Sequence, residues 1–242
     1  MLRVYHRWFS PSVDRDMELL VFGHGGARVL VFPTRCGRFY DFENFGLVES
    51  CRAAIEDGRI QLWCVDSFDG QSVYARWLPP ADRMPAHARF ERYVLDEVIP
   101  LSAERNPGGG LWTMGCSLGA WHAVNLAARH PQRFRRVIAL SGRYDLTRCF
   151  GRYRDLFDGW YDDTIYFNLP SHYLPRLDSP DLIADLRHLR IDLACGKTDV
   201  IASNNHELAD CLRSKGADLA FHQWDGEAHK ADAWRNMVSA YV

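Results

Sequence analysis

The stretch Leu111–Arg129 reads L-W-T-M-G-C-S-L-G-A-W-H-A-V-N-L-A-A-R. Its first four residues are typical of a buried strand, and residues 118–129 have the pattern of a helix. Gly115 and Gly119 lie two residues before and after Ser117, as a very sharp strand-to-helix turn requires, because larger side chains would clash there. Such a turn raises the Ser117 hydroxyl above the sheet edge, at a helix N-terminus that favours negative charge.

The remainder of the chain alternates apolar runs with amphipathic segments, which favours βαβ units and a mostly parallel sheet. Strands are predicted at residues 17–22, 28–32, 60–65, 111–114, 136–140, 191–195 and 218–224. Helices are predicted at residues 45–56, 90–103, 118–129, 204–215 and 230–242.

The first two predicted strands, 17–22 and 28–32, flank the turn-forming tetrapeptide G-H-G-G at 23–26. This arrangement predicts a β-hairpin, and hence an antiparallel edge near the N-terminus. We therefore expect an α/β architecture: a mostly parallel central sheet with an antiparallel N-terminal edge and helices on both faces.

The length of 242 residues predicts a single domain, 1–242, and the 47% apolar fraction is ordinary for a globular protein. Residues 142–184 form a long irregular stretch rich in aromatics and prolines, which is typical of a lid or pocket wall. A net charge of −2 argues against nucleic-acid and polybasic membrane binding. No metal-ligand spacing and no dinucleotide-binding glycine motif occurs, so we expect neither metal nor cofactor.

The seven cysteines are scattered and odd in number, without a C-x-x-C pair. The first residues, M-L-R-V-Y-H-R, carry His and Arg where a signal peptide has its apolar core, and no apolar run is long enough to span a membrane. Reduced thiols in a cytoplasmic protein are the expected state. Cys36 and Cys116 lie near the predicted site.

A serine hydroxyl needs a base and an orienting acid to become a nucleophile. The strand 191–195 is followed by G-K-T-D, which places Asp199 in a loop at a carboxyl strand end. The strand 218–224 is followed by D-G-E-A-H, which places His229 in the next such loop. Because carboxyl ends of parallel strands share one crevice, Ser117, Asp199 and His229 are the predicted nucleophile, acid and base.

Other carboxylates and histidines fit these positions less well. Some lie inside predicted strands or helices, or in the histidine's own loop, and the remainder fall in the irregular stretch; they are Asp162, Asp163, Asp192, Asp225, Glu227, His122, His206 and His222.

Two backbone N–H groups are expected to bind the oxyanion of a tetrahedral intermediate. The Leu118 amide follows the nucleophile directly. The loop after strand 28–32 supplies the second donor, at Thr34 or Arg35. His24-Gly25-Gly26 has the letters of a lipase oxyanion motif but precedes that strand, which favours a simple turn.

The start of the irregular stretch follows strand 136–140, so its polar side chains are candidates for contact with substrate. We expect this of Tyr144, Asp145, Tyr166 and Asn168; the alternative is that the tyrosines only pack the lid. Arg35 and Arg143 are candidates to meet an acidic group of the substrate.

Five segments together resemble the esterase D-like branch of the α/β-hydrolases, which includes S-formylglutathione hydrolases, feruloyl esterases and mycolyl transferases. They are F-P-T-R-C-G-R-F at 32–39, G-C-S-L-G at 115–119, Y-F-N-L-P-S-H-Y-L-P at 166–175, G-K-T-D at 196–199 and W-D-G-E-A-H at 224–229. The resemblance implies the α/β-hydrolase fold, the same roles for Ser117, Asp199 and His229, and the second-donor loop at Thr34–Arg35.

These features together predict a serine esterase that acts on a small-molecule ester through an acyl-enzyme intermediate. The alternatives are an acyltransferase or thioesterase with the same triad, or a catalytically silent binding protein on this fold. The final helix carries Trp234, Met237, Val238 and Tyr241 on one face. That stripe can cover the sheet, its more common use, or meet a second subunit in a homodimer.

Overall fold

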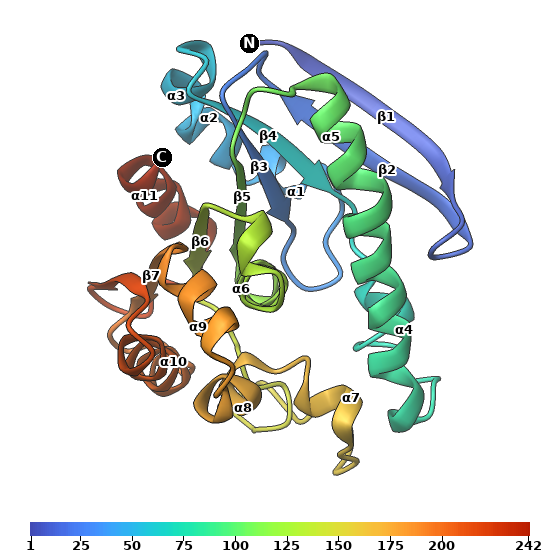
Figure 1. The fold of residues 1–242 in the computed structure, drawn as a ribbon, viewed down its shortest axis with the longest axis vertical. Coiled ribbons are helices and arrows are strands. Elements are labelled where there is room, and N and C mark those ends of the chain that lie inside the picture. Colours follow the sequence, from blue (N-terminus) through green and yellow to red (C-terminus); the bar gives the residue numbers. More distant parts are fainter.

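The computed structural model describes residues 1–242 and contains one eight-stranded sheet in the order β1-β2-β4-β3-β5-β6-β7-β8 (Figure 1). The strands are β1 (Arg3–Ser10), β2 (Arg15–Phe22), β3 (Ala27–Phe32), β4 (Ile60–Val65), β5 (Leu111–Cys116), β6 (Arg136–Leu140), β7 (Arg190–Gly196) and β8 (Asp218–Trp224). β3 to β8 are parallel to one another, and β1 and β2 form the antiparallel edge. The predicted α/β-hydrolase fold class is confirmed.

Eleven α-helices surround this sheet. They are α1 (Asp41–Asn44), α2 (Leu47–Ser50), α3 (Arg52–Glu56), α4 (Pro80–Tyr93), α5 (Ile99–Arg105), α6 (Leu118–Arg129), α7 (Asp163–Tyr166), α8 (Pro170–Tyr173), α9 (Pro180–Arg187), α10 (Ala202–Ser214) and α11 (Ala231–Tyr241). Short 3-10 helices are η1 (Asp69–Gln71), η3 (Pro131–Arg133) and η4 (Leu174–Arg176), and η2 (Val94–Val98) is a π-helical turn. None of the helices is both long and apolar enough to cross a lipid bilayer.

The predicted hairpin between residues 17–22 and 28–32 is wrong. β4 lies between these two strands, antiparallel to β2 and parallel to β3. The G-H-G-G turn packs against the start of β4: a Cβ on Gly26 would lie 2.3 Å from the Arg59 carbonyl. On its other edge β2 pairs with β1. The sequence did not reveal β1 because this edge strand is half-exposed and carries Arg3, His6 and Arg7 among its apolar residues.

The predicted helix at 45–56 is interrupted. The chain forms the short helices α2 and α3 instead, which are separated at Cys51, and Gly46, with a φ of +74°, separates them from α1. The predicted helix at 90–103 is longer than expected, because α4 already begins at Pro80, where a missing N–H costs nothing. The π-helical turn η2 precedes Pro100, whose ring nitrogen has no proton to continue the α-helical bonding.

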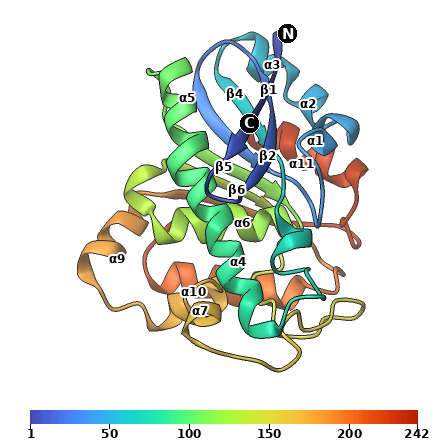
Figure 2. The ribbon, with the colours of Figure 1, turned by 90° about the vertical axis from the view of Figure 1, so that its right-hand side faces the viewer.

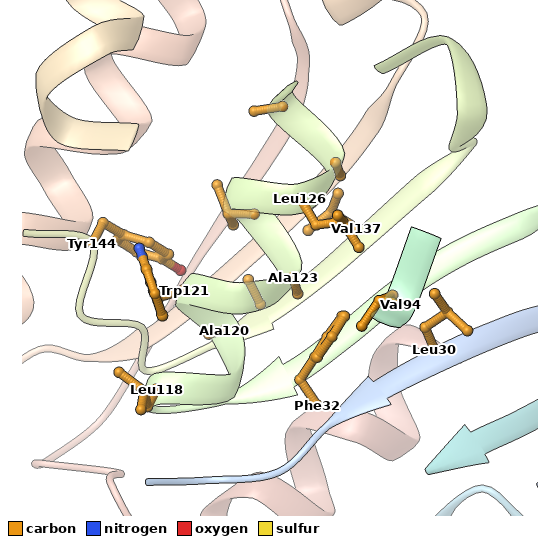
Figure 3. Close-up of a cluster of buried hydrophobic side chains, with 14 of the residues drawn as sticks. Leu30, Phe32, Val94, Leu118, Ala120, Trp121, Ala123, Leu126, Val137 and Tyr144 are labelled. Carbon is orange, nitrogen blue, oxygen red and sulfur yellow. The ribbon is translucent and has the colours of Figure 1, made fainter. Parts of the chain in front are cut away.

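Two apolar clusters cover the two faces of the sheet. α4, α6 and α10 pack over one face, and α1–α3 with α11 pack over the other (Figure 2). In the first cluster, Leu30 and Phe32 of β3 face Ala123 of α6 and Val94 (Figure 3). Trp234, Met237 and Val238 of α11 are buried in the second cluster, so this stripe covers the sheet.

Leu30 offers a test of this packing. Its side chain is 0% exposed in the first cluster, so Leu30→Ala should lower the free energy of unfolding by about 2–5 kcal/mol. Leu2, which is 53% exposed, is a matched control. Leu2→Ala should change the free energy of unfolding by less than about 0.5 kcal/mol. Chemical denaturation of both variants measures the difference, and equal effects would contradict the core assignment.

Candidate active site

Ser117 occupies a strained turn between β5 and α6. Its φ is +56° and its ψ −116°, a conformation that a residue with a side chain rarely adopts. The flanking glycines make this turn possible. A Cβ on Gly115 would lie 2.2 Å from Gly119, and a Cβ on Gly119 would lie 2.3 Å from the Phe32 carbonyl oxygen.

Ser117, His229 and Asp199 form one chain of hydrogen bonds. The Ser117 Oγ lies 3.0 Å from His229 Nε2, and His229 Nδ1 lies 2.8 Å from Asp199 Oδ2. The imidazole side chain is 5% exposed and the Asp199 side chain 0%. If Nδ1 carries the proton and donates to the carboxylate, Nε2 is free to accept the hydroxyl proton of Ser117.

The loops after β7 and β8 are paired beyond the ends of their strands, and this brings the acid to the base. Lys197 N donates to the Trp224 carbonyl, and Thr198 N donates to that of Gly226. A Cβ on Gly196 would lie 2.0 Å from the Glu227 carbonyl oxygen, so only glycine permits this approach.

None of the competing carboxylates and histidines is bonded to Ser117 or His229. Asp192 is buried and bonded to Arg136, and Asp225 is an exposed partner of Lys197. Among the alternative histidines, His206 bonds Gln223 on the surface.

The loop after β3 lies against the start of α6. The Phe32 and Pro33 carbonyl oxygens would be 2.3 and 2.6 Å from a Cβ on Gly119. Neither Thr34 N nor Arg35 N donates a hydrogen bond within the protein. The Leu118 N–H belongs to the first turn of α6, where amides have no helical acceptor. Unused amide donors therefore lie in the loop after β3 and at the start of α6, and both segments line the cavity at Ser117.

A buried polar link that the sequence did not reveal joins this loop to α6. Cys36 N donates to Asp69 Oδ2 at 2.9 Å, and Asp69 Oδ1 lies 2.9 Å from His122 Nε2. Asp69 is 1% exposed and His122 4%. Because Asp69 and His122 are 53 positions apart, no local spacing indicated that they would meet.

An open cavity of about 540 Å³ lies at Ser117. Its wall comes from the loop after β3, from the elbow, from α11 and from the segment after β6. The lining residues are Thr34, Arg35, Phe45, Tyr74, Ser117, Leu118, Arg143, Arg152, Tyr153 and Trp234. The Tyr153 hydroxyl also lies 3.2 Å from His229 Nε2. The stretch 142–184 thus contributes to the wall, but through Arg143, Arg152 and Tyr153.

None of the four residues expected to contact substrate lines this cavity. Tyr144 is fully buried near Trp121 of α6 (Figure 3). Its backbone N–H donates to Asn204 Oδ1. Asp145 is 3% exposed and lies 3.1 Å from His172 Nε2. The Tyr144 side chain packs the stretch against the body of the domain, whereas the Asp145 side chain bonds to Thr147 and His172 within the stretch itself.

The other two expected contacts also lie away from Ser117. Tyr166 lines a separate cavity with Arg129 and Arg176. Asn168 is buried, where its side-chain oxygen accepts from Arg129 and its carbonyl accepts from the Trp121 indole N–H. The path of an irregular segment has no periodicity, so the sequence could not indicate which side chains face the cavity.

All seven cysteines are free thiols. Cys116 is buried under the elbow, whereas Cys36 is exposed beside the loop after β3. Partial burial of the sulfur raises the pKa of Cys36 to about 11, so its thiolate is scarce near neutral pH. No group of three or more His, Cys, Asp or Glu side chains could hold a metal ion.

Comparison with known proteins finds relatives in sequence and in fold. An acetyl esterase of Caldicellulosiruptor saccharolyticus is 25% identical over 150 residues, which are 58% of this chain and 54% of that protein. The match thus spans about half the length of that relative.

Solved structures show the same fold. A ferulic acid esterase has a TM-score of 0.78 at 19% identity, over 99% of this chain and 96% of its own. An S-formylglutathione hydrolase of Agrobacterium tumefaciens has a TM-score of 0.72 at 15% identity, and the match covers 99% of this chain and 92% of that protein.

A family model described as "Putative esterase" matches residues 40–240, which include the elbow, the loops of Asp199 and His229, and most of the sheet. The chain therefore belongs to this esterase family, within the α/β-hydrolase fold.

Proposed function

We propose that the protein hydrolyses carboxylic esters through Ser117, His229 and Asp199, with a covalent acyl-enzyme intermediate. The observation that carries this proposal is the unbroken Asp199–His229–Ser117 hydrogen-bond chain at a strained turn that opens into a cavity. Membership of the esterase family supports the same reaction class.

His229 Nε2 takes the proton from Ser117 Oγ as that oxygen bonds to the ester carbonyl carbon. Asp199 holds the imidazole in the required tautomer and stabilises the imidazolium that forms. The imidazolium then gives its proton to the leaving alcohol as the C–O bond breaks. Water, deprotonated by His229, attacks the acyl-enzyme, and the acid is released as Ser117 recovers its proton.

The oxyanion of each tetrahedral intermediate is bound by two amides in this proposal. Leu118 N supplies one and the loop after β3 supplies the other, at Thr34 or Arg35. Support comes from the unused amide donors of the loop after β3 and of the first turn of α6. Asp69 and His122 act as positioning residues, because they tie Cys36, directly after these amides, to the helix that carries Leu118.

Replacing the nucleophile or the base tests the reaction. Ser117→Ala and His229→Ala should each lower kcat for p-nitrophenyl acetate by about 10⁴-fold or more, since triad members act as a unit. Ser117→Ala should also abolish labelling by a fluorophosphonate probe. His206→Ala, at an exposed histidine outside the site, should keep wild-type activity. Turnover that persists in Ser117→Ala would refute the assignment.

Replacing Asp69 tests the positioning role. Asp69→Ala should lower kcat about 10- to 100-fold with little change in KM, since a displaced amide weakens only the bond to the oxyanion. Asp69→Asn should recover part of the loss, because its amide oxygen can still accept from Cys36 N. Asp57→Ala, at an exposed carboxylate, is the control.

Steady-state kinetics on the Asp69 variants, with their folding checked by circular dichroism, distinguish a loss of amide positioning from general destabilisation. A loss expressed only in KM, or an Asp69→Asn variant as impaired as Asp69→Ala, would contradict the role.

A further inference from the structure

The cavity at Ser117 is lined by three arginines and by no aspartate or glutamate. Arg35 comes from the loop after β3, while Arg143 and Arg152 come from the segment after β6. The protein as a whole has a net charge of −2, so this concentration of positive charge belongs to the cavity and not to the chain in general. A cavity of this kind attracts and orients anions.

Arg143 has no carboxylate partner although it is only 3% exposed. Its Nε and Nη2 atoms donate to four main-chain carbonyl oxygens, and no ion pair forms. Its Nη1 atom has no acceptor in the protein. Carbonyl oxygens satisfy N–H groups and fix the guanidinium, but they do not neutralise its charge. The cation is therefore held rigidly at the cavity wall with donor capacity left over.

Arg35 and Arg152 are similarly available. Arg35 is exposed and forms no ion pair, and its guanidinium lies 5.7 Å from the centre of the Tyr74 ring. Arg152, whose side chain is 66% exposed, donates a long hydrogen bond to the Tyr153 hydroxyl at 3.4 Å, and its only carboxylate partner is the exposed Glu227 at 3.7 Å. An exposed pair at that distance contributes little, so both arginines can turn to a bound anion.

We propose that the preferred ester carries a carboxylate, which Arg35, Arg143 and Arg152 receive while the ester carbonyl lies at Ser117. This inference rests on the proposed esterase function and adds its substrate class. A carboxylate matches the planar fork of a guanidinium, which can donate two parallel hydrogen bonds to it. The three arginines line the same cavity as Ser117 and come from two different segments, so the carboxylate can belong to the acyl chain or to the alcohol.

Two matched pairs of esters test the proposal and locate the carboxylate. For the alcohol side, 4-acetoxybenzoate is compared with methyl 4-acetoxybenzoate. For the acyl side, mono(4-nitrophenyl) adipate is compared with its methyl ester. Each kcat/KM is divided by the alkaline hydrolysis rate of the same ester, which removes intrinsic reactivity. In at least one pair the anionic ester should be favoured about tenfold at low salt, and less as salt screens the charges.

Variants show whether the arginines cause this preference. Arg35→Gln and Arg143→Gln should each lower the anionic-to-neutral ratio about three- to tenfold, and Arg35→Lys and Arg143→Lys should retain much of it. Arg59→Gln removes an exposed arginine beside the start of β4, away from the cavity, and should leave the ratio unchanged. The ratio remains informative even where a variant loses activity on both esters.

The outcomes separate the two levels of inference. Equal normalised rates for both members of both pairs, or a ratio that both glutamine variants leave unchanged, would overturn the carboxylate proposal and leave the esterase function standing. If the glutamine variants lower kcat/KM by the same factor for the anionic and the neutral ester of a pair, the arginines act only on the oxyanion. That result would also overturn the carboxylate proposal. Absence of turnover of all four esters together with absence of fluorophosphonate labelling would overturn the esterase function itself.

Discussion

The close approach of the Ser117 turn to the end of β3 is the constraint on which the rest of the site depends. With a Cβ on Gly119, the helix α6 could not come so near the Phe32 and Pro33 carbonyls. That approach places the loop after β3, with its unused amides, beside Leu118. The same close packing holds Ser117 at a φ of +56°, with its hydroxyl toward His229. Backbone contact, rather than any side-chain interaction, thus positions the nucleophile.

Buried polar groups then fix the loops that surround this turn. Asp69 and His122 join the loop after β3 to α6. Arg143 donates hydrogen bonds to several main-chain carbonyls of the segment after β6. Because these groups are buried, each unsatisfied partner would carry a desolvation cost, so the loops have few alternative paths. Rigid loops suit a site whose proposed chemistry needs donors placed before the charge develops.

Periodicity and turn chemistry were sufficient to predict the parallel part of the sheet, and strand order along the chain was sufficient to place Ser117, Asp199 and His229 at one edge. The prediction failed where partners are remote in sequence. The G-H-G-G turn was compatible with a hairpin, but β4 inserts between β2 and β3, and only the competition among strands for hydrogen-bond partners decides this. Edge strand β1 had too mixed a pattern to be identified.

The sequence by itself determined the class of fold, the strained serine turn and the loops that carry the acid and the base, because each is encoded by a local pattern. Only the tertiary structure decided which side chains line the cavity. Tyr144 and Asn168 were buried against α6, and Arg152 and Tyr153 faced Ser117 instead. The conformation of an irregular segment is fixed by buried hydrogen bonds and apolar contacts with distant parts of the molecule. These contacts produce no periodic pattern in the sequence of the segment itself.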